Sequence, residues 1–254
     1  MRQIQNIEQI LVAKVVSTFT GFALASPPVL PTSPANARMT KRIDVDRCCG
    51  IIIDVQEFFL AQIDNRARAR IVANTANFAR LIGYFEIPIV VTLEKPVSRK
   101  GGVPAEIDTQ AGPGAARFEK SFFDLTREAR IRDGLKRLKK NQAIVAGCET
   151  DVCVLQSCLG LLDLGYDVFA VEELLFSSAR DVASAVARMR AEGVVFLSYK
   201  SLYYELLAAV AGDRHGDAME RRFGPFPDDL PDCAVEWPYV RKNSPPDAPA
   251  RGRP

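Results

Sequence analysis

The chain has 254 residues, of which 48% are hydrophobic and 25% charged, a composition typical of a globular protein that can bury one sizeable core. Its 33 basic and 31 acidic residues are well mixed and give a net charge of +2, with no basic stripe interleaved with aromatics, so we do not expect a nucleic acid partner. The single histidine, His215, excludes most zinc sites and any Ser–His or Cys–His catalysis that does not use it.

Six cysteines stand at positions 48, 49, 148, 153, 158 and 233. A chain of this length builds its own core and does not need disulfide bonds. Four of the cysteines also lie in or beside apolar runs that we interpret as buried strands and helices. We therefore expect reduced thiols in a cytoplasmic protein.

The first 45 residues do not resemble a folded domain. The apolar run at 10–30 is interrupted by Lys14 and ends among prolines, so we expect no membrane-spanning helix. Three interpretations stay open: translation that begins at Met39, a signal peptide with Ala-Asn-Ala at 35–37 as its cleavage site, and a disordered arm. We expect a disordered or non-native extension at 1–45, an α/β domain at 46–212 and a partly disordered tail at 213–254.

Strand and helix patterns alternate from residue 48 onward. The apolar run at 49–55 predicts a buried parallel strand whose carboxyl end carries Asp54. A helix is predicted at 64–83 and a strand at 87–92, followed by a segment at 94–117 with four glycines and three prolines, which we expect to be a long loop.

The same alternation continues to residue 211. The predicted elements are a helix at 127–140, a strand at 142–147, a helix at 151–164, a strand at 167–171, a helix at 181–192, a strand at 194–198 and a helix at 200–211. This order predicts a doubly wound, mostly parallel sheet of Rossmann type, with helices on both faces in three layers. Ligands of such folds bind beyond the carboxyl ends of the strands.

Cys153 is the candidate nucleophile. It falls in the first turn of the helix predicted at 151–164, where the partial positive charge of a helix N-terminus favours a thiolate. A neighbouring lysine would favour it further, and a carboxylate could accept its proton. The residues alone leave open that Cys153 is one more buried structural cysteine.

Three segments resemble the isochorismatase-like cysteine hydrolases. Residues 51–60 (IIIDVQEFFL) are similar to the opening Asp-x-Gln-x-x-Phe motif of that family, and residues 143–154 (AIVAGCETDVCV) to its strand, turn and nucleophile. Residues 118–123 (FEKSFF) resemble the segment that carries the family lysine, and 165–171 and 187–194 also resemble family positions. The resemblance covers residues 48–211 in the right order.

The resemblance implies a catalytic triad of Asp54, Lys120 and Cys153. The aspartate would take the thiol proton, the cysteine would attack an electrophilic carbon, and the lysine would support both charges. The family's cis peptide before the nucleophile turn would join Cys148 and Glu149, and the backbone N–H groups of Glu149 and Cys153 would hold the oxyanion. Water would then release the acyl or carbamoyl group from the thioester.

Two departures from the family narrow the reaction. The nicotinamidase branch holds a metal with an aspartate and histidines after its second strand, whereas this chain has Thr92-Leu-Glu-Lys-Pro there. We therefore expect no metal, no other cofactor and no nicotinamide. True isochorismatases lack the nucleophilic cysteine, so hydrolysis of an amide or ureide fits better than the namesake reaction.

Further residues are candidates for the substrate pocket: Gln56, Phe59, Glu94, Phe122 and Phe123. Each has a plain structural alternative, such as orienting a loop, facing water or packing in the core. The expected partners are a small-molecule substrate and further copies of the chain, without nucleic acid or membrane. Alternatives are a hydrolase of an ester or vinyl ether, a non-catalytic binding or scaffold protein, and a nucleotide-binding protein, which lacks its glycine-rich turn because Asp54-Val-Gln-Glu stands there.

Overall fold

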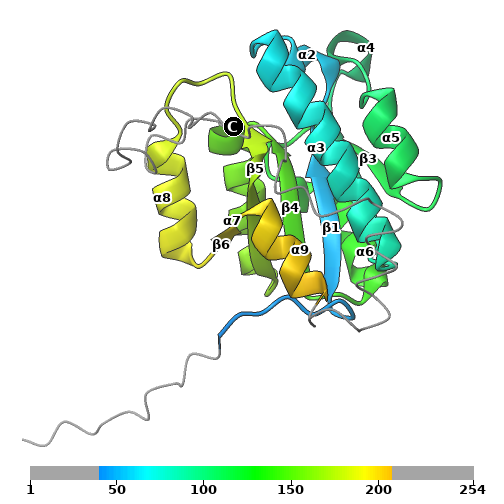
Figure 1. Cartoon of the computed structure of the whole chain (residues 1–254), viewed down its shortest axis with the longest axis vertical. Coiled ribbons are helices and arrows are strands. Elements are labelled where there is room, and N and C mark those ends of the chain that lie inside the picture. Colours follow the sequence, from blue (N-terminus) through cyan, green and yellow to red (C-terminus); the bar gives the residue numbers. More distant parts are fainter. Residues whose placement is uncertain (1–39, 208–254) are drawn as a thin grey trace, which may run out of the picture. The chain divides into compact units, whose positions relative to one another are not determined.

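The computed structural model describes residues 40–207, and the fold is given for that part of the chain. Six parallel strands form one sheet in the order β3-β2-β1-β4-β5-β6 (Figure 1). The strands are β1 (Cys48–Ile53), β2 (Ile89–Glu94), β3 (Ala116–Lys120), β4 (Gln142–Cys148), β5 (Asp167–Phe176) and β6 (Val195–Leu197). The predicted doubly wound α/β fold is therefore confirmed.

Helices connect the strands. They are α2 (Glu57–Leu60), α3 (Asn65–Tyr84), α4 (Val97–Lys100), α5 (Ala105–Ala111), α6 (Ala129–Leu138), α7 (Leu155–Asp163), α8 (Ala183–Glu192) and α9 (Tyr199–Leu207). A 3₁₀ turn, η1 (Leu125–Arg127), precedes α6, and a π-helical turn, η2 (Thr150–Val154), precedes α7. The long helix α3 begins at Asp64, whose carboxylate caps the backbone N–H groups of Arg66 and Ala67.

Two apolar cores lie on opposite faces of the sheet. All six residues of β1 are buried, and because successive side chains of a strand point to opposite faces, they divide between the cores. Ile52 packs in a core with residues of α3, α5 and α9, such as Phe78, Ile107 and Leu202. Ile51 and Ile53 pack in the other core with residues of α6, α7 and α8, such as Ile131, Leu161 and Met189. The sheet and the helices packed on its two faces form the three layers visible in Figure 1.

The prediction of a long loop at 94–117 is wrong. The structure places α4, α5 and the start of β3 in this segment, and β3 is a sixth strand that the sequence pattern did not predict. β3 lies at the edge of the sheet and pairs only with β2, so its Arg117 and Glu119 are not buried and its five residues show no apolar run. α4 and α5 have four and seven residues, too few for an apolar periodicity to stand out.

The folded unit begins a few residues before the predicted boundary at residue 46. Lys41 Nζ donates to the carbonyl oxygen of Gly193 over 3.1 Å, and the backbone N–H of Asp44 donates to Gln142 Oε1 over 2.8 Å. The tail predicted at 213–254 and His215 lie outside the described residues. Within residues 40–207 no helix is long and apolar enough to cross a membrane.

Candidate active site

Four side chains from separate segments meet at the carboxyl edge of the sheet. Asp54 directly follows β1, Glu94 ends β2, Lys120 ends β3 and Cys153 lies in η2 after β4. The register explains the meeting, because Ile53 pairs with both Thr92 and Gly147, and Glu94 pairs with Lys120. Parallel strands that end together thus deliver residues far apart in sequence to one point.

The turn that carries Cys153 begins where β4 passes close to β1. Gly147 has φ +129°, and a Cβ atom there would lie 2.0 Å from the carbonyl oxygen of Ile53, so only glycine fits. The next peptide bond, between Cys148 and Glu149, is cis. Cys153 then lies in the π-helical turn rather than in the first turn of an α-helix, and its residue is only 1% exposed.

Cys148 and Glu149, which the cis peptide bond joins, form hydrogen bonds with Asp54 and with the loop that follows β5. The thiol of Cys148 donates to the backbone carbonyl of Asp54 over 3.0 Å. The Glu149 side chain accepts hydrogen bonds from the N–H and hydroxyl of Ser178. These contacts attach the nucleophile turn to both neighbouring strands, while the oxyanion role of the Glu149 and Cys153 N–H groups stays a prediction.

Asp54 and Lys120 form a fully buried ion pair. Lys120 Nζ lies 2.6 Å from Asp54 Oδ2 and donates to the carbonyl of Phe122 over 3.1 Å. The same nitrogen lies 3.5 Å from Cys153 Sγ. Burial alone would lower the pKa of Lys120, but Asp54 and Cys153 together raise it, so Lys120 carries its positive charge beside the sulfur. The structure thus brings together the three predicted triad residues.

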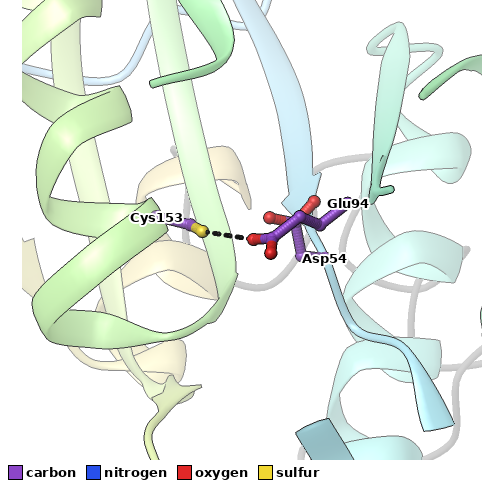
Figure 2. Close-up of side chains that lie close together, drawn as sticks. All are labelled: Asp54, Glu94 and Cys153. Atoms are coloured by element: carbon purple, nitrogen blue, oxygen red, sulfur yellow. Dashed lines mark hydrogen bonds between the residues drawn. The ribbon is translucent and has the colours of Figure 1, made fainter. Parts of the chain in front are cut away.

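Glu94 is a second carboxylate in the site, and it contacts the Cys153 thiol directly. The Cys153 thiol donates to Glu94 Oε2 over 3.0 Å, the contact marked in Figure 2. The other oxygen of Glu94 forms an ion pair with Lys100 of α4. Gln56 fixes the backbone around this residue, since its Oε1 accepts from the Glu94 N–H over 2.7 Å and its Nε2 donates to Gly101 O over 2.8 Å. Gln56 therefore orients the backbone of the site, while its role in a substrate pocket stays a prediction.

The surroundings of Cys153 favour its protonated thiol form. Burial raises the pKa of Cys153 well above its ordinary value, and the negative charges of Asp54 and Glu94 raise it further against the opposing effect of Lys120. This environment opposes the thiolate expected at a helix N-terminus, because Cys153 is buried, lies in a π-helical turn and faces two carboxylates. Burial also raises the pKa of Asp54, although Lys120 and Thr92 act in the other direction.

The donor atoms of Asp54, Glu94 and Cys153 lie within 4.8 Å of one another, close enough in principle to hold a metal ion. Lys120 Nζ already lies among them, at 2.6 Å from Asp54, 3.8 Å from Glu94 and 3.5 Å from Cys153. The ammonium group supplies the positive charge that a metal would bring, and the cluster contains no histidine. These residues therefore fit a lysine-based site better than a metal centre.

The predicted phenylalanines take different positions. Phe59 is buried in the core that contains α3, and Lys100 Nζ lies 5.4 Å from its ring centroid. Phe122 and Phe123 are exposed, although their backbone carbonyls accept hydrogen bonds from Lys120 and Ser157, respectively. Their main chain thus supports the site, while a pocket role for their rings stays a prediction.

Sequence reasoning missed two residues of the site. Thr92 is fully buried and donates its hydroxyl hydrogen to Asp54 Oδ1 over 2.8 Å. Lys100 stood in the segment expected to be a loop, and only its helical turn brings it back to Glu94, six residues earlier. A polar residue near the end of a buried strand was the one available signal for Thr92.

Comparisons with known proteins identify the family of the chain. The family model described as Isochorismatase domain matches residues 48–201. The secreted isochorismatase effector Isc1 of Phytophthora sojae is 30% identical over 159 residues, which cover 61% of this chain and 74% of the effector.

Solved structures show the same fold. The MAR1 ribonuclease from Caenorhabditis elegans matches with a TM-score of 0.67 at 21% identity, over 77% of this chain and 97% of its own. The YcaC gene product of Escherichia coli, described as an octameric hydrolase of unknown specificity, matches with a TM-score of 0.64 at 23% identity, over 71% of this chain and 89% of its own.

Proposed function

Because the chain belongs to the isochorismatase family, we propose that it is a metal-independent hydrolase that cleaves a small amide or ureide through a thioester on Cys153. One observation carries this proposal above the others. A cysteine thiol, a lysine ammonium and two carboxylates from four different segments lie within hydrogen-bonding or ion-pairing reach of one another. A structural cysteine needs no such partners, whereas a nucleophile that must lose and regain a proton does.

The chemistry would run in two halves. Cys153 Sγ forms a bond to the carbonyl carbon while its proton passes to a carboxylate of the site. The tetrahedral oxyanion is held by the N–H groups of Glu149 and Cys153, and its collapse breaks the C–N bond as the leaving nitrogen takes up the proton. Water then attacks the thioester, the acyl or carbamoyl group leaves as an acid, and the thiol is restored.

Lys120 would remain a cation throughout this cycle. Its raised pKa keeps the ammonium charged beside the sulfur, where it stabilises negative charge on the thiolate that departs from the thioester. Resemblance to the family assigns the proton transfer to Asp54. The structure adds Glu94, which offers a second acceptor for the same proton.

Self-association is a further part of the proposal. The similar protein from Escherichia coli is described as octameric. In this chain Phe58, Phe122 and Phe123 expose between 44% and 50% of their surface near the carboxyl edge of the sheet. We expect assemblies larger than a monomer, measurable by light scattering coupled to size-exclusion chromatography.

Trapping of the acyl intermediate tests the hydrolase. The chain is incubated with a panel of small primary amides and N-carbamoyl compounds, quenched in acid and measured by intact-mass spectrometry, while ammonia release is followed in parallel. We expect an adduct with the mass of the acyl or carbamoyl group that is absent in Cys153→Ala and retained in Cys158→Ala, a matched loss of a buried thiol in the core. Turnover that survives Cys153→Ala would rule out the thioester, and an inert chain across amides, ureides and esters would favour a scaffold role.

A further inference from the structure

We propose that Glu94 is a catalytic residue of this site: its carboxylate takes the proton of the Cys153 thiol as the sulfur attacks, and it returns that proton to the leaving nitrogen. Asp54 then serves to hold and orient Lys120. This assignment rests on the proposed hydrolase function and deepens it. It divides the work of two carboxylates that lie side by side in the structure (Figure 2).

Asp54 is engaged on both of its oxygens. Oδ2 lies 2.6 Å from Lys120 Nζ, and Oδ1 accepts the hydroxyl hydrogen of Thr92 over 2.8 Å. Both partners are fully buried, so water cannot replace either contact. Protonation of this carboxylate would leave the buried Lys120 ammonium without its closest counter-charge, which is unfavourable in a low-dielectric interior.

Glu94 is placed differently. Its Oε2 already accepts the hydrogen bond from Cys153 Sγ at 3.0 Å, so the proton can pass directly from the sulfur to the carboxylate. Its Oε2 lies 3.8 Å from Lys120 Nζ, a weaker contact than that of Asp54. Of the four converging side chains, that of Glu94 alone reaches solvent appreciably, with 12% exposure against none for Asp54 and Lys120. A substrate that enters from solvent therefore meets the thiol next to Glu94.

Lys100 is a positioning residue in this arrangement. Its ammonium forms the ion pair with Glu94 and lies 5.4 Å and 5.9 Å from the ring centroids of Phe59 and Phe58, a cradle that holds the cation at the site entrance. Lys100 contacts the carboxylate of Glu94 and so acts on that group. It keeps Oε2 of Glu94 turned toward Cys153 by occupying the other oxygen.

The charged groups around Glu94 decide its proton affinity. They come from every packed element: Lys100 from α4, Lys120 from β3, Asp54 after β1 and Cys153 in η2. Burial alone would raise the pKa of Glu94, but hydrogen bonds from Lys100 and Cys153 and the charge of Lys120 together lower it. Glu94 thus stays ionised and ready to accept a proton, while burial raises the pKa of Asp54 and makes Asp54 the rival acceptor.

The proton balance of the cycle closes on Glu94. The S–H bond breaks as the S–C bond forms, and the carboxylate becomes a carboxylic acid. Cleavage of the C–N bond gives that proton to nitrogen and restores the carboxylate. The attacking water then delivers a proton to the same oxygen, which returns it to the departing sulfur.

The experiment measures the proton of Cys153 directly and needs no substrate. Iodoacetamide alkylation of Cys153 in the full chain is timed between pH 4 and 9 by peptide mapping. The chains are wild type, Glu94→Gln, Asp54→Asn and Lys100→Met, with Arg99→Met as the control on the same helix, because Arg99 is exposed. Thermal unfolding by circular dichroism confirms that each variant is folded.

We expect wild type to alkylate at a level rate through neutral pH and to lose that rate only at acidic pH, as Glu94 becomes protonated. Glu94→Gln removes the level region of the profile. The alkylation rate at neutral pH falls by about 10²-fold, the scale of general-base assistance. Lys100→Met moves the acidic fall to higher pH, because the pKa of Glu94 rises without its ion pair, and Arg99→Met leaves the profile unchanged.

Two outcomes would overturn the assignment. If Asp54→Asn loses the level region while Glu94→Gln keeps it, Asp54 carries the proton. If Glu94→Gln alkylates faster at every pH, Glu94 only suppresses the thiolate. If Asp54→Asn fails to fold, the comparison of Glu94→Gln with Lys100→Met and wild type still decides the matter. A chain that shows the expected profile but hydrolyses no amide or ureide would contradict the proposed function alone.

Discussion

Thr92 and Asp54 are joined twice across neighbouring strands. The Thr92 hydroxyl donates to Asp54 Oδ1 over 2.8 Å, and the Asp54 N–H donates to the Thr92 carbonyl over 3.1 Å. Asp54 adopts a positive φ of 51°, a backbone conformation that is uncommon for residues other than glycine. One residue of β2 therefore fixes both the main chain and the side chain of the acid beside Lys120.

Replacement of Thr92 by valine keeps the shape of the side chain and removes its hydroxyl. We expect Thr92→Val to lower the free energy of unfolding by about 1.5–3 kcal/mol, the range for a hydrogen bond to a charged group. Thr92→Ser keeps the hydroxyl and loses one methyl group, so its loss should be nearer about 1 kcal/mol. Urea unfolding measures both, and equal losses would show that packing rather than the hydrogen bond matters at this position.

Removal of Lys120 leaves a carboxylate buried without its ion-pair partner. We expect Lys120→Met to destabilise the chain by about 3–5 kcal/mol, because Asp54 stays in a dry interior uncompensated. The double variant Asp54→Asn/Lys120→Met should recover a large part of this loss. A double-mutant cycle by chemical unfolding provides the measurement. If the loss of unfolding free energy in the double variant equals the sum of the two single losses, the two residues are not a coupled pair.

Ser157 bridges α7 and the segment that holds Lys120. Its hydroxyl donates to Phe123 O over 3.2 Å and accepts from the backbone N–H of the buried Leu125 over 3.1 Å. Ser157→Ala leaves that N–H without its acceptor, so we expect a loss of about 1–3 kcal/mol in unfolding free energy. Ser201→Ala serves as the control at an exposed serine and should change stability little.

Gly147 has no room for a side chain. A Cβ atom there would meet the carbonyl oxygen of Ile53 at 2.0 Å, so Gly147→Ala must push β4 away from β1 at the nucleophile turn. We expect a destabilisation well above about 1 kcal/mol or a failure to fold. Gly102→Ala, where no atom lies within 4 Å of the added Cβ, should melt near wild type. Similar melting temperatures for the two variants would contradict the close approach of these strands.

Five of the six strands, and the meeting of Asp54, Lys120 and Cys153 at one site, could be predicted from the sequence. Apolar runs such as that of β1 and the motif at 143–154 are local patterns, so they can be recognised in the sequence before the structure is known. β3 could not be predicted, because an edge strand with Arg117 and Glu119 facing away from the core has no apolar pattern. The contact of Lys100 with Glu94 also depends on a short helix that tertiary packing, and not local propensity, stabilises.

The protonation of the nucleophile could not be predicted for a related reason. A helix N-terminus and a lysine both favour a thiolate, and both are visible in the sequence. The burial of Cys153 and the approach of the Asp54 and Glu94 charges are not visible there, yet burial first and these charges second raise the pKa of the thiol against the effect of Lys120. Burial and charge at a site depend on every element packed around it, so they follow only from the folded chain.

Lys120 ends β3, one of the two edge strands of the sheet, whereas Cys153 follows the inner strand β4. A border strand hydrogen-bonded on one side opens at lower free energy than strands in the middle. The proposed hydrolase activity should therefore be lost in two stages on warming. Detachment of β3 would withdraw the ammonium first, with the thiol still in place, and amide hydrogen exchange would register this step below the temperature at which the interior strands separate.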